Sequence, residues 1–248
     1  MRQLPPGTIT SAVAAYRGCD ADTALPKDAD PGMLRHLSWD VCRLHFEGSK
    51  LKRKESKREL DRLHLVAYLA AQGMLQGASG LLHTNVHHYD AALEALRTHA
   101  DDVAGLNPRK YRKEKHRKKL LAAQHDVSVA LLPNSGGIAT AASKSLLAVF
   151  GCMPGFDGAF SQAMRDMSED VFPASTFNAP TDEGLAFIAE FYLAHADEID
   201  DLAGRIRVVD VAAGAYTGIP VGRARILDMF AAQRAAELAE ERKAARRR

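Results

Sequence analysis

The sequence predicts an all-α protein that folds as a single compact domain of many helices. Apolar residues recur at spacings of three and four along nearly the whole 248-residue chain, as they do on amphipathic helices. No convincing run alternates apolar and polar residues; Val208, Val209 and Val211 are the best strand candidate, and they are too few to build a sheet. The apolar composition of 46% is enough to fill a sizeable core.

The expected helices begin and end at residues that commonly interrupt helices. Proline, glycine and asparagine stand at the boundaries, for example near residues 30–32, 107–108, 133–134, 180–182 and 219–220. In chain order, we expect helices at 9–17, 33–47, 55–82, 89–104, 109–131, 138–150, 158–167, 183–195, 198–205 and from 221 to the C-terminus.

The segment 60–82 is apolar almost all round and contains Gly73, Gly77 and Gly80. A glycine costs a helix about 1 kcal/mol relative to alanine, so three of them call for a reason such as the close approach of a neighbouring helix. We therefore expect this segment to be the buried, glycine-bearing central helix, with a break allowed at 77–80. The last segment is expected to be a solvent-facing basic helix that ends in a cationic tail at 242–248.

No repeat or low-complexity linker divides the chain, so we expect one domain over 1–248, with 105–118 as the place for any subdivision. No apolar stretch is long enough for a membrane helix, and the first ten residues lack the apolar core of a secretion signal. These features predict a cytoplasmic protein. Cys19, Cys42 and Cys152 have no CxxC spacing, which favours reduced thiols over disulfides or a zinc site.

The net charge is only +2, but the cations cluster in two tracts at 50–58 and 109–119. Such clusters are typical of nucleic-acid binding, with DNA favoured over RNA, although a solvated helix face is the alternative. Within the second tract, Tyr111 and His116 are candidates to stack on a base or to touch a phosphate. The candidate nucleic-acid contacts in the two tracts are Lys52, Arg53, Lys54, Arg112, Lys113, Lys115, Arg117 and Lys118.

Metal and cofactor chemistry receives little support from the sequence. His83 and His87 stand four residues apart with Asp90 nearby, but no further histidine or cysteine completes a ligand set. The chain also lacks a Gly-x-Ser-x-Gly elbow, a phosphate-binding Gly-Lys-Ser/Thr loop and a dinucleotide-binding glycine motif. We therefore expect neither a metal nor a cofactor.

The segment 132–157 is the part of the sequence most suggestive of chemistry. A turn with Gly136 and Gly137 precedes a helix of small residues, and a second turn ends at Asp157. A glycine-rich turn before an open helix N-terminus can receive a phosphate, because backbone N–H groups and the helix dipole point at one spot. Asp157 has two interpretations: the N-cap of the next helix or a functional carboxylate.

This layout resembles the helix-hairpin-helix DNA glycosylases, in which a glycine-bearing hairpin leads into a helix and an aspartate follows. The resemblance implies that Gly136 and Gly137 grip a DNA phosphate and that Asp157 acts at the sugar of a flipped-out nucleotide. Bifunctional members have a Schiff-base lysine where this chain has Ile138 and Ala139, so the resemblance implies a lysine-independent enzyme. Lys144 is then a candidate substrate or phosphate contact.

The chain also resembles a group of uncharacterised bacterial helical proteins, through segments 68–82 and 144–157. That resemblance implies no function. Tyr68 and Gln72, one turn apart in the first of these segments, are candidate pocket residues. The alternative to a DNA-repair or defence enzyme is a non-catalytic helical module, in stress or phage defence, that binds protein or RNA through its cationic surface.

Overall fold

The computed structural model describes residues 1–19, 29–49, 51, 55–76, 80–132 and 139–247. Helices form almost all of the regular structure in this part of the chain, which confirms the all-α fold class. The α-helices are α1 (Thr8–Arg17), α2 (Ser38–Ser49), α3 (Glu55–Ala71), α4 (Asp90–Val103), α5 (Glu114–Leu131), α6 (Ala139–Phe150), α7 (Gly158–Met167), α8 (Asp182–Ala194), α9 (Ala196–Arg205) and α10 (Arg223–Arg246). Short 3-10 helices are η1 (Pro31–Met33), η2 (Leu81–His83), η3 (Val86–Tyr89), η4 (Pro108–Arg112) and η6 (Ala174–Phe177).

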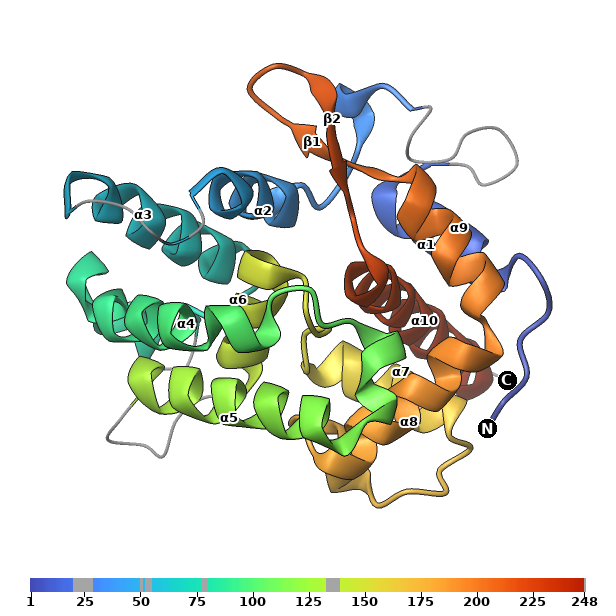
Figure 1. The fold of residues 1–248 in the computed structure, drawn as a ribbon. Helices are drawn as coiled ribbons and strands as arrows, with labels where there is room; N and C mark the ends of the chain where they lie inside the picture. The colour runs from blue at the N-terminus through green and yellow to red at the C-terminus, as the bar shows by residue number, and fades with distance from the viewer. Residues whose placement is uncertain (20–28, 50, 52–54, 77–79, 133–138, 248) are drawn as a thin grey trace.

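The α-helices form two groups that lie side by side (Figure 1). Helices α2 to α6 pack together on one side, while α1 and α7 to α10 pack on the other. The 3-10 helix η4 and helix α5 also contact α8, so the two groups share one continuous core. The two chain ends lie near each other at the edge of the second group (Figure 1).

Helix α6 is the buried helix at the centre of the fold. Every residue from 141 to 149 is buried, and α6 contacts α2, α3, α4 and α5. Its small residues, alanine and serine, allow these neighbours to approach closely, and Leu146 and Leu147 fill the space between them. The polar members of this run, which include Ser143 and Lys144, must therefore find hydrogen-bond partners inside the protein.

The expected long glycine-bearing helix at 55–82 is wrong in its length. Helix α3 ends at Ala71, and Gly73 follows with a φ of 74°. The N–H of Gly73 donates to the carbonyl of Ala70, and that of Met74 to Leu69, the pattern of a left-handed glycine cap at a helix C-terminus. The glycine is therefore a stop signal for α3, and the central helix of the fold is α6 instead.

A small antiparallel hairpin replaces the isolated strand expected from the valines. Strand β1 (Arg207–Asp210) pairs with β2 (Ala215–Pro220), and Val208 and Val209 of β1 are fully buried. The second strand has a sequence, Ala-Tyr-Thr-Gly-Ile-Pro, with no alternation strong enough to predict it. The hairpin packs on α2, where Val209 N–H donates to the carboxylate of Asp40 at 3.0 Å.

Several helix ends also differ from the expected positions. The helix expected from residue 33 begins at Ser38, after η1, and the one expected from residue 109 begins at Glu114, after η4. The C-terminal helix is confirmed as α10, which runs to Arg246, but the expectation that it faces solvent is wrong for its beginning: residues 224–231 are buried because α10 packs against α1, α7 and α9. In the described part of the chain, no helix is both long enough and apolar enough to span a membrane.

Candidate functional site at Lys144 and Asp157

Lys144 and Asp157 form a partly buried ion pair where the two groups of helices meet. The Nζ atom of Lys144, on α6, lies 2.7 Å from Oδ2 of Asp157, at the start of α7. The same ammonium donates to Oε1 of Gln72, just after α3, at 3.1 Å. The lysine side chain is 4% exposed, whereas the aspartate side chain is 30% exposed. Three residues singled out separately in the sequence are thus brought together, with Asp157 towards solvent.

The two carboxylate oxygens of Asp157 have different partners. Oδ1 accepts a hydrogen bond from the backbone N–H of Phe160 at 2.8 Å, which makes Asp157 the N-cap of α7. Oδ2 faces the ammonium of Lys144. The capping interpretation of the sequence is therefore correct, and it leaves one oxygen for the ion pair.

The turn that leads to Asp157 is held against α6 and α10 by side-chain hydrogen bonds. Gly155 N–H donates to Oδ1 of Asp228 at 3.0 Å, and Phe156 N–H donates to Oγ of Ser143 at 2.9 Å. A Cβ atom on Gly155 would stand 3.0 Å from Cγ of Lys144 and 3.1 Å from Oδ1 of Asp228. The turn needs glycine at this position because its backbone passes directly over both side chains.

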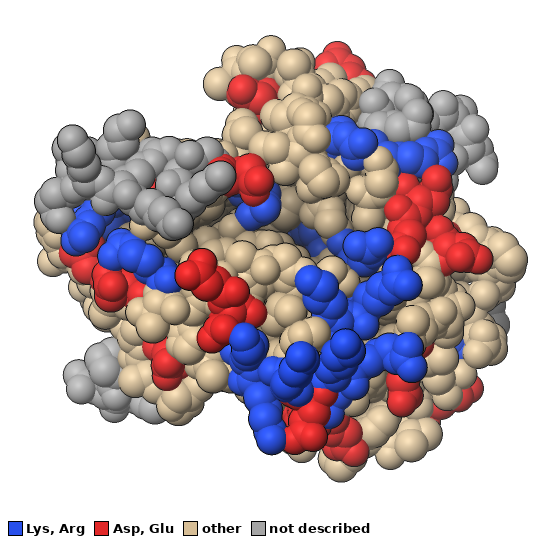
Figure 2. Space-filling model, in the orientation of Figure 1, with Lys and Arg blue, Asp and Glu red and all other residues tan. Residues whose placement is uncertain are grey.

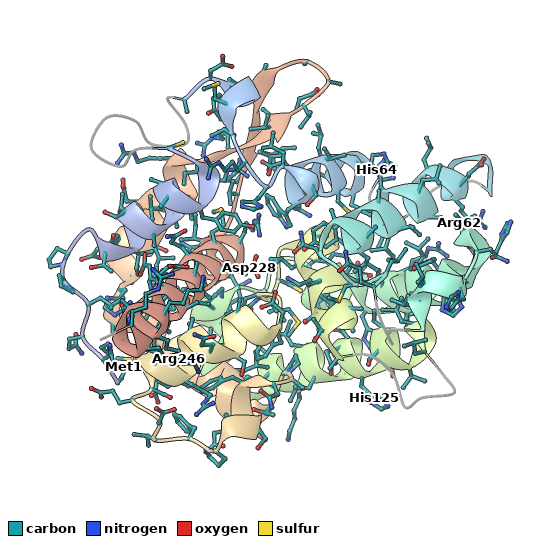
Figure 3. The ribbon with its side chains drawn as sticks, turned by 180° about the vertical axis from the view of Figure 1, so that it is seen from behind. Met1, Arg62, His64, His125, Asp228 and Arg246 are labelled. Carbon is teal, nitrogen blue, oxygen red and sulfur yellow. The ribbon has the colours of Figure 1, made fainter. Side chains whose placement is uncertain are left out.

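A second layer of buried charges, which no sequence pattern predicts, lies behind the pair. Arg225 of α10 is ion-paired with Asp228, and its guanidinium lies 5.2 Å from the ring centroids of both Tyr16 and Trp39. Figure 3 labels Asp228 near the centre of the molecule, seen from behind. A cation between two aromatic rings is attracted by their π-electrons and is kept from water.

A second buried ion pair, between Arg17 and Asp40, joins α1 to α2. Its N–O distances are 2.7 and 3.1 Å, and both side chains are essentially inaccessible to solvent. The only signal for such residues is a charge at an apolar position of an amphipathic helix, as in Ser-Trp-Asp-Val-Cys around Asp40. That signal indicates burial, but it does not say which residue is the partner.

The surroundings keep Lys144 protonated. Burial alone would lower the pKa of its ammonium, but the carboxylates of Asp228 and Asp157 outweigh burial, and the net effect raises the pKa. The nitrogen lone pair is therefore occupied by a proton at neutral pH. In this state Lys144 acts as a positive charge and a hydrogen-bond donor, and it is not a nucleophile.

Tyr68 lies deeper than the pocket position expected for it. Its side chain is 1% exposed, and its hydroxyl has no hydrogen-bond partner among the described residues. Burial, followed by the charge of Asp228, raises the pKa of this hydroxyl well above its usual value. Gln72 is only half-buried, and its Nε2 donates to Oγ of Ser38 at 3.2 Å, so it stands between the ammonium and the surface.

The tract at 109–119 forms a basic surface. Figure 2 shows Lys and Arg side chains gathered over η4 and the beginning of α5. Three of the cations are neutralised: Arg117 by Asp182, Lys118 by Glu114 and Lys119 by Asp102. In the described part of the chain, no carboxylate pairs with the other five cations of the tract, all of them exposed, namely Arg109, Lys110, Arg112, Lys113 and Lys115.

Two residues expected to contact nucleic acid, Tyr111 and Lys144, are buried instead. Tyr111 cannot stack on a base because it is fully buried, with its hydroxyl donating to the carbonyl of Cys152. Lys144 is too deeply buried to reach a phosphate on the surface. The hydrogen bond from Tyr111 nevertheless attaches the basic tract to the turn that ends at Asp157. Five further predicted contacts, Lys52, Arg53, Lys54, Gly136 and Gly137, lie outside the described residues.

The histidine segment shows no metal-binding arrangement. Asp90 is ion-paired with Arg62 at 2.6 Å, and Nδ1 of His87 lies 3.6 Å from the second oxygen of Asp90. No cluster of three or more histidine, cysteine, aspartate or glutamate side chains in the described ranges could hold a metal ion.

Comparisons with known proteins add no relatives to this description. No protein-family model, curated protein or solved structure matches the chain.

Proposed function

We propose that this protein binds nucleic acid, DNA in preference to RNA, and cleaves an N-glycosidic bond at Asp157 without a covalent lysine intermediate. The observation that carries the proposal is the position of Asp157: one oxygen is fixed by the N-terminus of α7, and the other is held beside a buried ammonium on the partly exposed side of the pair. A carboxylate fixed in this way is ready for one orientation of substrate.

The chemistry requires a negative charge next to the sugar. As the bond between C1′ and the base breaks, its electron pair leaves with the base, which takes up a proton, and positive charge develops on the sugar. The carboxylate of Asp157 stabilises that charge and accepts a proton from the water that attacks C1′. Lys144 holds the carboxylate in its orientation through the charged hydrogen bond between the ammonium and Oδ2.

The protonated state of Lys144 supports a reaction that uses water. An amine can attack C1′ only after it has lost its proton, and the two neighbouring carboxylates oppose that loss. The reaction would therefore release a free base and leave the DNA strand intact. This is the lysine-independent chemistry that the resemblance to the helix-hairpin-helix glycosylases implies.

Nucleic-acid binding is proposed for the unpaired cations of η4 and α5. Each phosphate that they neutralise releases counterions, so binding must weaken as salt increases. Their connection to the active turn through Tyr111 and Cys152 supports a common orientation on one substrate. A cytoplasmic location and a role in DNA repair or defence belong to the same proposal.

The test combines binding with product detection. The protein is titrated with duplex DNA at increasing salt, and DNA with uracil, alkylated or oxidised bases is then examined for released base by chromatography. We expect the logarithm of affinity to fall linearly with that of salt, by about 0.9 per phosphate contacted, together with release of at least one base. Salt-dependent binding without release of any base would favour the non-catalytic module, and absence of binding at low salt would refute the proposed DNA binding.

Matched variants test which surface binds. Replacing Lys113 and Lys115 by glutamine removes two cations without carboxylate partners, whereas replacing Lys118 and Lys119 removes two that are already paired. We expect the first double variant to lose more affinity and more salt dependence than the second. Equal losses would show that the pairing seen in the structure does not determine the contact surface.

A further inference from the structure

A pocket of about 370 Å³ opens beside the basic tract and is separate from the Lys144–Asp157 site. It lies between α2, α4 and the C-terminal end of α6, which Figure 1 shows between the other two helices. Val149 in its wall is five residues along α6 from Lys144, which corresponds to about 7.5 Å of helix axis. The pocket and the ion pair therefore contact α6 at two different positions along its axis.

The inner wall of the pocket is apolar and partly aromatic. It is made by Phe46, Leu51, Val149 and Phe150, of which the first three are almost fully buried. Leu51 adopts a φ of 52°, which is uncommon for a side chain of this type, and its carbonyl accepts a hydrogen bond from Arg97 at 2.9 Å. This fixed wall suits a flat, apolar ring better than a long flexible chain.

The polar groups of the pocket are mainly hydrogen-bond acceptors. The carboxylates of Glu47 and Asp101 stand at its edge. Glu47 is paired with Arg43, whose guanidinium also donates to the carbonyl of Val149, so the arginine is already satisfied. Asp101 is exposed and has no cationic partner among the residues that the structure describes. A ligand that fits these groups must offer N–H donors at the edge of its ring.

The basic tract begins at the rim of this pocket. Gly105 lines the pocket, and its carbonyl accepts a hydrogen bond from Nζ of Lys110 at 2.8 Å. Asp102, next to Asp101, is paired with Lys119 of α5. A ligand seated in the pocket would thus have cations immediately outside it, in the position where the phosphates of a nucleotide would lie.

We infer that the pocket receives one unpaired nucleobase with an exocyclic amino group, that is, adenine, cytosine or guanine, from a single-stranded stretch whose phosphates lie on the tract. The apolar wall stacks against the base, and Asp101 accepts the amino N–H. Thymine and uracil lack this donor and would leave the carboxylate unpaired. This inference rests on the proposed nucleic-acid binding, and it adds a second nucleotide site apart from the cleavage site.

The test compares short homopolymers of deoxyadenosine, deoxycytidine and deoxythymidine by fluorescence anisotropy with the full chain. We expect the first two to bind about fivefold or more tightly than the third, as for one good base contact. Two variants should abolish that preference: Ala100→Trp, which fills the pocket from α4, and Asp101→Ala, which removes the acceptor. The matched controls Ala91→Trp, exposed on the same helix, and Asp102→Ala should retain it.

The outcomes separate this inference from the proposed function. Salt-dependent binding with no difference between the homopolymers would overturn the base pocket and leave nucleic-acid binding intact. A preference that survives in both Ala100→Trp and Asp101→Ala would likewise overturn it, provided that thermal melting shows both variants to be folded. If no homopolymer binds at low salt, the pocket assignment is wrong, and the separate titration with duplex DNA decides whether the proposed binding function is wrong as well.

Discussion

The two roles of Asp157 can be separated by substitution because they reside on different oxygens. Asparagine keeps a side-chain oxygen that can accept from the N–H of Phe160, so Asp157→Asn removes the charge and retains the cap. Alanine removes both. Lys144→Met replaces the ammonium by an uncharged chain of similar length in the same buried position.

The expected magnitudes follow from burial. Leaving one member of a buried ion pair without its partner costs about 3–5 kcal/mol. Asp157 is 30% exposed, and Gln72 and Asp228 remain beside the ammonium, so we expect Asp157→Asn to lower the free energy of unfolding by about 2 kcal/mol. Loss of the cap adds about 1 kcal/mol, so Asp157→Ala should cost about 3 kcal/mol.

Urea unfolding followed by circular dichroism measures these differences. In the Lys144→Met background no buried ammonium remains, so Asp157→Asn should then cost almost nothing, a coupling of about 2 kcal/mol. Thr181→Ala is the control, because Thr181 caps α8 through Gly184 and should lose about 1 kcal/mol in either background. Equal stability of the asparagine and alanine variants, or no coupling to Lys144, would refute this description of the pair.

Two further predictions concern the surroundings of the pair. Gly155→Ala should destabilise the protein by about 1–3 kcal/mol, because its Cβ would press on Lys144 and Asp228, whereas Gly158→Ala, with open space around its Cβ, should be tolerated; equal unfolding midpoints would contradict this. Alkaline pH should also destabilise the fold. Folding raises the pKa values of Lys144 and Tyr68, so both groups favour the folded state in their protonated forms. Their contribution to the free energy of unfolding is complete below the pKa values of the unfolded chain, near 10.4 for lysine and about 10 for tyrosine. It is lost as pH rises towards the pKa values of the folded protein. Urea unfolding between pH 8 and 11 should show the decline, reduced in Lys144→Met; a flat profile would refute it.

The fold class could be predicted from the sequence because helical periodicity is local. The signal that ends α3 is equally local, because Gly73 adopts the left-handed conformation and stops the helix at Ala71. The apolar residues that continue beyond Gly73 extend the helical pattern, so periodicity alone predicts a helix that is too long. The hairpin was missed because β2 is short and lacks alternation.

The candidate site was predictable only in part, for a physical reason. Lys144 and Asp157 lie thirteen residues apart, on either side of one recognisable turn, so their sequence pattern identifies both. The second layer joins residues far apart in the chain, such as Arg225 and Tyr16, which are separated by 209 positions. Such partners are chosen by how the helices pack, which a local pattern does not encode. The burial of Tyr111 could not be predicted for the same reason, because its neighbours in the sequence are mostly basic and its packing partners come from elsewhere in the chain.

The most direct test of the proposed chemistry is single-turnover release of free base by the native protein and by Asp157→Asn, with protein in saturating excess over the DNA and at a temperature where both are folded. If the ionised carboxylate beside Lys144 stabilises the sugar, the two proteins will bind DNA equally, and only the native protein will release base. Release by the asparagine variant at the native rate, or no release by the native protein from any damaged base, would contradict it.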